Sequence, residues 1–118
     1  MLFVCYPRCS TCKKAQKWLD EHGIAYEMRD IKTENPNREE LRSWFERSGL
    51  PIKRFWNTSG QKYRELNLKD KLATMTEDEQ LDLLATDGML VKRPILVSDH
   101  AVLVGFREEE WQRHLLGD

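Results

Sequence analysis

Two cysteines three positions apart are the residues best suited to chemistry in this sequence. Cys9 and Cys12 stand in the segment Tyr6-Pro7-Arg8-Cys9-Ser10-Thr11-Cys12-Lys13-Lys14, at the start of an apolar helical pattern. This spacing puts both thiols near each other at a helix N-terminus, within reach of a disulfide after small adjustments. The pair therefore predicts a dithiol that can be oxidised and reduced.

The location of the pair favours the reactive thiolate form of the first cysteine. Unpaired backbone N–H groups, the helix dipole and nearby cations all stabilise a negatively charged sulfur. The nearby cations are Arg8, Lys13, Lys14 and Lys17. Cys9 is the expected nucleophile, and Cys12, one turn deeper, is the expected resolving thiol that attacks a mixed disulfide or a sulfenic acid on Cys9.

Two other interpretations of the pair remain open. A Cys-x-x-Cys motif can form half of a zinc site, although the histidines form no second ligand pair. These histidines are His22, His100 and His114. The two thiols could also be buried and inert, but Pro7 and Arg8 before Cys9 favour a loop over a core strand. Cys5 lies within an apolar run and is expected to fill the core.

Composition predicts one soluble domain over residues 1–118, with 40% hydrophobic and 33% charged residues. The net charge is −1 and the basic residues are spread along the chain, so no nucleic-acid-binding surface is expected. The apolar run Met1 to Tyr6 is too short for a signal peptide or a membrane span, which favours a cytoplasmic location. In that reducing compartment, closely spaced cysteines indicate catalysis, redox sensing or metal binding.

The elements that must position the cysteines begin with a βαβ unit. Leu2 to Cys5 is a short apolar run typical of a buried strand, and Ser10 to His22 follows as a helix that Gly23 is expected to end. Ile24 to Met28 alternates apolar and polar residues and predicts a second strand, parallel to the first.

The middle of the chain, 32–90, shows no convincing strand but at least two helices. Their starts resemble capping boxes, formed by Asn37 with Glu40 and by Thr76 with Glu79. Gly49 and Gly88 are expected to end these two helices. The polar turn Phe55 to Gly60 lies between them, before a shorter helical stretch over about 61–66. This turn is either a helix–helix loop with an N-cap or a segment that faces the substrate.

The C-terminal part predicts a hairpin followed by a helix. Pro94 to Val97 and Ala101 to Val104 indicate two antiparallel strands, and Arg107 to Leu116 indicates the closing helix. The whole pattern predicts an α/β fold of the thioredoxin-like (glutaredoxin-like) class, a βαβ–ββα mixed sheet. Residues 1–31 and 91–118 would form its core, and 32–90 a helical insertion between the second and third strands.

Four segments resemble the arsenate reductase (ArsC) and Spx family in order and approximate spacing. They are Tyr6 to Lys14, Asn57 to Leu68, Lys92 to Ile95, and Val104 to Arg107. The resemblance covers essentially the whole chain and is strongest to ArsC-like proteins related to Spx and MgsR. It implies that Cys9 is the redox nucleophile and that Pro94 is a cis-proline beside it. From the residues alone, Pro94 is only a proline at the start of a strand.

The resemblance also implies an oxyanion site. In arsenate reductases, arginines at the positions of Arg93 and Arg107 help hold the oxyanion, through paired charge-assisted hydrogen bonds. Without the family, each is a surface arginine or, for Arg107, a residue at a helix start. Asn57 stands where a third arginine is found in reductases that depend on glutathione and glutaredoxin, which resolve with an external thiol rather than with a residue such as Cys12. Both departures weigh against arsenate as the natural substrate.

Two functions follow as hypotheses. The first is a thiol–disulfide oxidoreductase with Cys9 and Cys12 as its redox centre, in which Arg93, Arg107 and Asn57 shape an anion-accepting pocket. Its substrate would be arsenate or a protein or low-molecular-weight disulfide. It needs no bound cofactor or metal, and its electrons would come from glutathione, glutaredoxin or thioredoxin. The second is an Spx-like redox-switched transcriptional regulator that binds the RNA polymerase α subunit.

Overall fold

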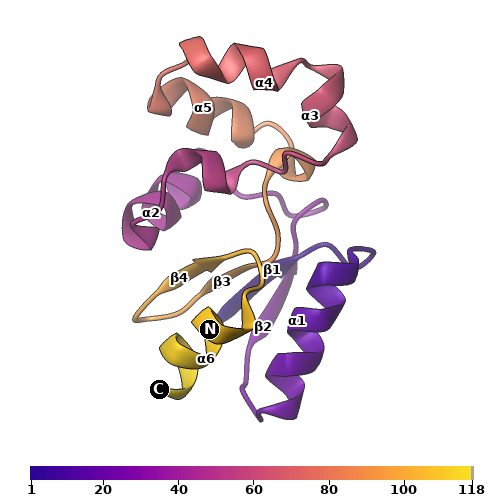
Figure 1. Ribbon diagram of the computed structural model, residues 1–118, viewed down its shortest axis with the longest axis vertical. Coiled ribbons are helices and arrows are strands. Elements are labelled where there is room, and N and C mark those ends of the chain that lie inside the picture. The colour runs from indigo at the N-terminus through magenta and orange to yellow at the C-terminus, as the bar shows by residue number, and fades with distance from the viewer. Residues whose placement is uncertain (118) are drawn as a thin grey trace.

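The chain folds around one mixed sheet, seen in a computed structural model that describes residues 1–117 (Figure 1). Asp118, the last residue of the predicted domain, lies outside the described residues. The strands are β1 (Leu2–Cys5), β2 (Glu27–Asp30), β3 (Ile95–Val97) and β4 (Val102–Val104). Their order is β2-β1-β3-β4; β1 runs parallel to β2, and the other pairs are antiparallel. The predicted thioredoxin-like mixed sheet is confirmed.

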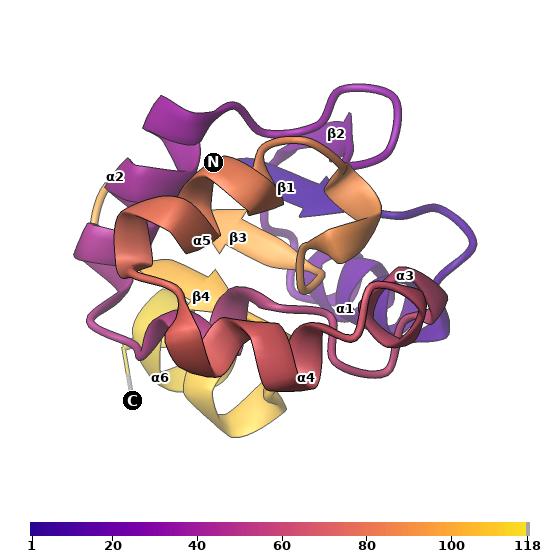
Figure 2. The same cartoon turned by 90° about the horizontal axis from the view of Figure 1, so that it is seen from above.

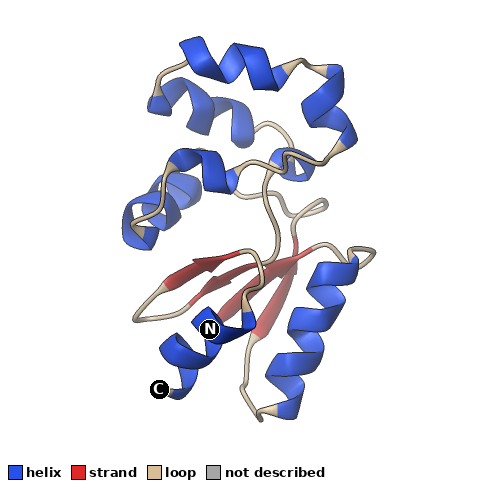
Figure 3. Ribbon diagram, viewed as in Figure 1, coloured by secondary structure: helices blue, strands red, loops and turns tan. Residues whose placement is uncertain are grey.

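Two helices cover one face of the sheet, α1 (Ser10–Glu21) and α6 (Glu108–Leu116) (Figure 3). Because side chains alternate along a strand, Phe3 of β1 points to these helices while Val4 points to the opposite face. Trp18 of α1 and Trp111 of α6 meet edge to face against this layer, with ring centres 6.1 Å apart. The aromatic layer fixes α1, and with it the cysteine pair, against the sheet.

The opposite face is covered by the segment between β2 and β3 (Figure 2). Every regular element of this segment is an α-helix or a 3₁₀ helix. It contains α2 (Arg38–Ser48), η1 (Ile52–Phe55), α3 (Gln61–Glu65), α4 (Leu68–Lys71), η2 (Leu72–Thr74), α5 (Glu77–Leu84) and η3 (Gly88–Leu90), where η marks a 3₁₀ helix. Its buried side chains form one cluster with the sheet. That cluster includes Val4, Leu41, Trp44, Phe55, Leu81, Leu84 and Ile95. No helix among residues 1–117 is both long and apolar enough to span a membrane.

The two predicted capping boxes are present, at Asn37 before α2 and at Thr76 before α5. Gly49 ends α2 in the left-handed conformation, with φ 68°. The expectation that Gly88 ends α5 is wrong, because α5 already ends at Leu84. Gly88 instead starts η3, where a Cβ atom would lie 1.7 Å from the carbonyl oxygen of Ile31. Its role is to allow close approach of two backbones.

The second strand is shorter and later than the predicted Ile24 to Met28. It begins at Glu27, which pairs with Leu2 at the first position of β1. Residues 24–26 have no strand opposite them, because β1 starts only at Leu2. Ile24 instead donates its backbone N–H to Leu19 at 3.0 Å and completes the end of α1. The partner strand, rather than the alternating pattern, decides where β2 starts.

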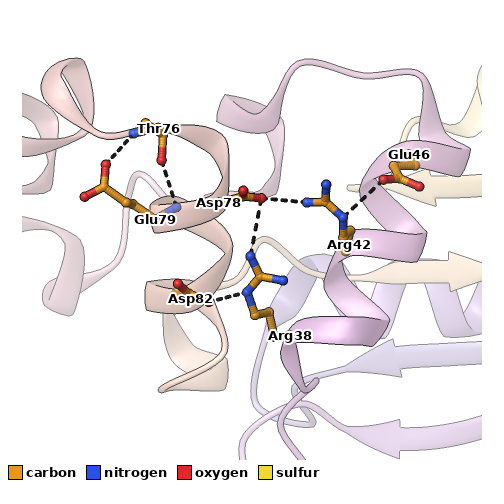
Figure 4. Close-up of polar contacts among 7 residues, drawn as sticks. All are labelled: Arg38, Arg42, Glu46, Thr76, Asp78, Glu79 and Asp82. Atoms are coloured by element: carbon orange, nitrogen blue, oxygen red, sulfur yellow. Dashed lines mark hydrogen bonds and ion pairs between the residues drawn. The ribbon is translucent and has the colours of Figure 1, made fainter.

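Ion pairs connect α2 to its neighbours. Arg29 of β2 holds Glu40 through two hydrogen bonds, of 2.6 and 2.9 Å. On the outer side, Arg38 and Arg42 both reach Asp78 of α5, at 3.3 and 2.7 Å (Figure 4). The first pair therefore ties α2 to the sheet, and the second set ties α2 to α5.

Candidate redox site

Cys9 and Cys12 lie in different environments at the N-terminus of α1. Cys9 is the N-cap residue, with extended backbone angles (φ −84°, ψ 125°), and its side chain is half-buried. Its N–H donates to the carbonyl of Tyr6 at 2.9 Å. Cys12 is 2% exposed, and its Sγ accepts a hydrogen bond of 3.3 Å from the backbone N–H of Tyr6. Both thiols are free. Of the two, Cys9 is the one that is partly exposed to solvent.

Cys5 belongs to the same cluster of thiols. As expected it is buried in the core, at 2% exposure, on the face of β1 that packs against α1. The neighbouring Cys5 thiol raises the pKa of Cys12, burial raises that pKa further, and the Tyr6 N–H opposes both. Cys12 is therefore held in its neutral form more firmly than an ordinary cysteine.

Arg93 lies beside the start of the cysteine loop. Its guanidinium carbon is 5.3 Å from the ring centre of Tyr6, and Nη1 donates to the carbonyls of Met89 and Val91 at 3.2 and 3.3 Å. The peptide bond between Arg93 and Pro94 is cis. The arginine thus connects the C-terminal end of η3 to the loop that leads into Cys9.

Asn57 is a second side chain, besides Tyr6, that lies beside the Arg93 guanidinium. With its amide oxygen turned toward the guanidinium, Asn57 accepts from both Nη1 and Nη2 at 3.3 Å. Its backbone N–H donates to Leu90 at 2.8 Å, which anchors the turn against η3. Gly60 leaves room for this side chain, since a Cβ there would lie 2.5 Å from the end of Asn57. The structure therefore brings Asn57 and Arg93 together.

Arg107 occupies a different place. It lines a groove of about 390 Å³ together with Thr11 of the cysteine motif, and no hydrogen bond among residues 1–117 joins it to Asn57 or Arg93. Within the same residues, no group of three or more His, Cys, Asp or Glu side chains is placed to hold a metal ion. The predicted site residues thus divide between an Asn57–Arg93 contact beside Tyr6 and a groove beside Thr11.

Comparison with known proteins shows the family of the chain. A family model described as "ArsC family" matches residues 5–114. This chain belongs to the ArsC family. Its relatives in Bacillus subtilis include the uncharacterized protein YusI, 53% identical over 97% of each chain, and the regulatory protein MgsR, 34% identical over 93% of this chain and 86% of MgsR. The global transcriptional regulator Spx of Enterococcus faecalis is 31% identical over 95% of this chain and 83% of Spx.

Solved structures agree with this assignment. An ArsC family related protein from Bacteroides fragilis is 58% identical, with a TM-score of 0.93 over 95% of this chain and 94% of that chain. A protein described as a possible arsenate reductase from Streptococcus mutans is 46% identical, with a TM-score of 0.86 over 94% of this chain and 96% of the other. The family thus contains proteins named as reductases and as regulators.

Two neighbours of the cysteine pair in this ArsC-family chain were not expected from its sequence. Tyr6 supplies both the N–H bonded to Cys12 and the ring beside Arg93. Cys5 interacts with Cys12 although it stands in a strand. Strand alternation could have indicated the second contact, because Phe3 and Cys5 share the face that a following helix must cover. No sequence signal indicates the role of Tyr6.

Proposed function

We propose that this chain is a thiol–disulfide oxidoreductase with Cys9 as nucleophile and Cys12 as resolving thiol. One observation supports this most directly: a half-buried cysteine at the N-cap of α1 is followed, one turn deeper, by a buried cysteine. The first thiol is half-buried at the start of the helix and accessible to a substrate. The second thiol, Cys12, is buried, and the Cys5 thiol and burial raise its pKa, which favours its protonated form.

The proposed reaction has two exchange steps. The Cys9 sulfur attacks one sulfur of a substrate disulfide, so that a mixed disulfide forms and the other substrate thiol leaves and takes up a proton. The Cys12 thiol then loses its proton and attacks the Cys9 sulfur, which releases the second substrate thiol and leaves a Cys9–Cys12 disulfide. An external thiol donor, either glutathione, glutaredoxin or thioredoxin, returns both cysteines to the reduced state.

A disulfide is favoured over arsenate as the substrate. The Arg93 guanidinium already donates to two backbone carbonyls and contacts Asn57, so part of its capacity to hold an oxyanion is used within the protein. A neutral amide at Asn57 cannot add the charge that a second guanidinium would bring to a bound oxyanion. We infer that Arg93 mainly positions the Tyr6 loop.

Single cysteine replacements test the proposal. Cys9→Ser is expected to abolish reduction of a model disulfide, because the attacking sulfur is lost. Cys12→Ser is expected to stop after the first step and to accumulate a mixed disulfide on Cys9, detected by mass spectrometry under non-reducing conditions. Ser10→Ala, which changes an exposed residue between the cysteines, serves as the control for general damage to the loop. Unchanged turnover in Cys9→Ser would contradict the proposed mechanism.

A redox-switched regulator is the second candidate, and the similarity to MgsR and Spx favours it. In that case the Cys9–Cys12 disulfide would change the affinity for a protein partner, with the RNA polymerase α subunit as the first to test, and the chain would turn over no substrate. A pull-down with the α subunit under reducing and oxidising conditions separates the two candidates. If the captured amount is the same in both conditions, the regulator proposal fails.

A further inference from the structure

A third thiol lies behind the cysteine pair and takes no part in the reaction proposed above. Cys5 of β1 and Cys12 of α1 are each 2% exposed, and both belong to the core between the sheet and α1. Cys9 packs against the same core from the loop, where it is partly exposed. Three free thiols therefore gather at the end of β1, one at the surface and two in the core.

Cys12 is the middle thiol of the three. Its Sγ lies 3.3 Å from the backbone nitrogen of Tyr6, against the peptide unit that joins Cys5 to Tyr6. The Cys5 thiol raises the pKa of Cys12 and the Cys9 thiol lowers it, so both thiols are neighbours of the Cys12 sulfur. Cys12 also lowers the pKa of Cys5 through direct contact, whereas Cys9 acts on Cys5 only through its charge. The order of the thiols in space is therefore Cys9, Cys12, Cys5.

This order suits a second thiol–disulfide exchange. In such an exchange the attacking sulfur approaches the attacked sulfur from the side opposite to the leaving sulfur. When Cys9 and Cys12 are joined in a disulfide, Cys12 is the central sulfur, with Cys9 toward the solvent and Cys5 toward the core. Cys5 is thus placed to attack Cys12 and to displace Cys9.

We propose that Cys5 is a third redox thiol, which attacks Cys12 in the Cys9–Cys12 disulfide and transfers that disulfide into the core. The bond between the Cys5 and Cys12 sulfurs forms as the bond between Cys9 and Cys12 breaks. Cys5 gives up its proton, and the leaving Cys9 sulfur takes one up, so the step neither gains nor loses electrons. The inference rests on the proposed function, which supplies the Cys9–Cys12 disulfide.

The transfer changes what the oxidised protein exposes. A thiol donor reaches the Cys9–Cys12 disulfide at its partly exposed Cys9 sulfur. Both sulfurs of a Cys5–Cys12 disulfide belong instead to residues that are 2% exposed. Cys9 becomes a free thiol again, so it can attack a second disulfide while the first one is stored in the core. Reduction of the stored disulfide then runs back through Cys9, which attacks Cys12.

Trypsin cleavage after Arg8 tells the two disulfides apart, because Arg8 lies between Cys5 and the other two cysteines. A Cys9–Cys12 disulfide stays within the peptide 9–13. A Cys5–Cys12 disulfide joins that peptide to the one before it and leaves Cys9 free to react with N-ethylmaleimide. The position of the disulfide can therefore be measured directly by mass spectrometry of the digested protein.

The transfer is followed over time in the parent protein. The reduced chain is oxidised with diamide, which takes up two electrons and two protons from a pair of thiols. Samples are then blocked with N-ethylmaleimide and digested. We expect the Cys9–Cys12 disulfide first, and then joined peptides with maleimide on Cys9 that exceed about a tenth of the oxidised protein at equilibrium. A smaller share would overturn the transfer.

Two serine variants test the route. In Cys9→Ser, diamide is expected to join Cys5 and Cys12 at least about tenfold more slowly than in the parent, because both thiols are buried. An equal rate would show that the core disulfide forms without Cys9. The matched control is Cys12→Ser, in which Cys5 and Cys9 have no central thiol between them. Joined peptides that form there as fast as in the parent would contradict the spatial order of the three thiols.

Diamide needs no substrate, so the transfer can be judged apart from turnover. If the Cys5–Cys12 disulfide forms while Cys9 reacts with no model disulfide, the oxidoreductase proposal fails and the transfer stands. If a model disulfide is turned over but the oxidised protein contains the Cys9–Cys12 disulfide alone, the transfer is overturned and the proposed function stands.

Discussion

The thiols of Cys9 and Cys12 differ in what surrounds them, although they are separated by one helical turn. Cys9 has a backbone hydrogen bond to Tyr6 and partial access to solvent. Cys12 is enclosed, touches the Cys5 thiol, and accepts the Tyr6 N–H. Because the Cys5 thiol and burial raise the pKa of Cys12, its thiolate is scarce at neutral pH. In the proposed reaction, the second exchange step therefore requires a proton to be removed from a thiol that is held protonated, because it uses Cys12.

The second step should depend steeply on pH. When Cys9 is loaded in advance as a mixed disulfide, release of the bound thiol by Cys12 is expected to accelerate about tenfold per pH unit from pH about 7 to 9, because the thiolate fraction of Cys12 rises in that proportion. Stopped-flow detection of the released thiol measures the rate. A rate that levels off by pH about 9 would show that the Cys12 pKa is not raised above its ordinary value.

Asn57 stands where the family resemblance implies a third arginine in arsenate reductases that depend on glutathione and glutaredoxin. Replacing it with arginine would put a second guanidinium beside Arg93. In Asn57→Arg we expect repulsion to lower the melting temperature without anions. Sulfate should then raise it by about 4 °C more than in the parent, at about ten times its dissociation constant. Asn57→Gln controls for side-chain size, and an equal sulfate effect in both variants would contradict the expectation.

The cysteine motif could be predicted from the sequence because both thiols and the helix start lie within one short segment. The contact between Asn57 and Arg93 could not be derived from the residues themselves; only the family resemblance placed them in one site. Their contact depends on β3 pairing with β1, with Ile95 opposite Val4, which brings residue 93 to the end of the cysteine strand. Contacts that require long-range pairing carry no local signal.

Among the elements, α2 is held by two kinds of ion pair with different surroundings. The side chains of Arg29 and Glu40 are 18% and 32% exposed, and they form two parallel hydrogen bonds between β2 and α2. The side chains of Arg42 and Asp78, which connect α2 to α5, are 46% and 64% exposed. Solvent screens exposed pairs strongly, so the inner pair should contribute more to stability than the outer one.

Glu40→Gln tests this difference, since glutamine can keep the capping hydrogen bond from Asn37 but loses the charge. The Arg29 guanidinium lowers the pKa of Glu40 below its ordinary value of 4.5. Its stabilisation is therefore present above that pH and lost as the pH falls through the lower folded value. Urea unfolding at neutral pH should show a loss of about 1–2 kcal/mol, reduced for partial exposure.

The matched control is Asp78→Asn on the outer pairs, which should cost less than Glu40→Gln. Repeating both measurements at pH about 3 gives a second check, because the loss in Glu40→Gln should shrink there. Equal losses at both pH values would show that the charge of Glu40 is not the stabilising feature.

At the scale of the molecule, the sheet separates two hydrophobic cores, one against α1 and α6 and one against the helical segment between β2 and β3. That helical segment leads back to the sheet through η3. Gly88 lies where the helical segment returns to the sheet, against the backbone of Ile31, the residue that follows β2. Asn35 adds a hydrogen bond of 2.9 Å to the carbonyl of Ala85 at the same junction. The junction fixes where η3, and therefore Arg93, lies relative to the cysteine loop.

Gly88→Ala should disturb this junction. A methyl group there would lie 1.7 Å from a carbonyl oxygen, so two backbone segments must move apart. We expect a loss of about 1–3 kcal/mol in the free energy of unfolding, measured by urea. Disulfide turnover should also fall, because Arg93 moves with η3. Ser43→Ala on the exposed side of α2 is the control, and a variant of parent stability would contradict the proposed close approach.

The order of the helices and strands could be predicted from the sequence, but the residues at which several of them begin and end could not. The capping boxes at Asn37 and Thr76 were visible because their chemistry is local, whereas the start of β2 and the end of α5 depend on neighbours far along the chain. Gly88 illustrates the limit, since a glycine that ends a helix and one that allows backbones to touch have the same sequence signature.

The strand order has a consequence for synthesis on the ribosome. β1 ends at Cys5 and its neighbour β3 begins at Ile95, so the sheet cannot close until the segment between them has been translated. At about 5–20 residues per second, the nascent cysteine pair waits about 5–20 s for that partner. During this interval the thiols of Cys9 and Cys12 lack both Arg93 and the buried layer that surrounds them in the folded protein.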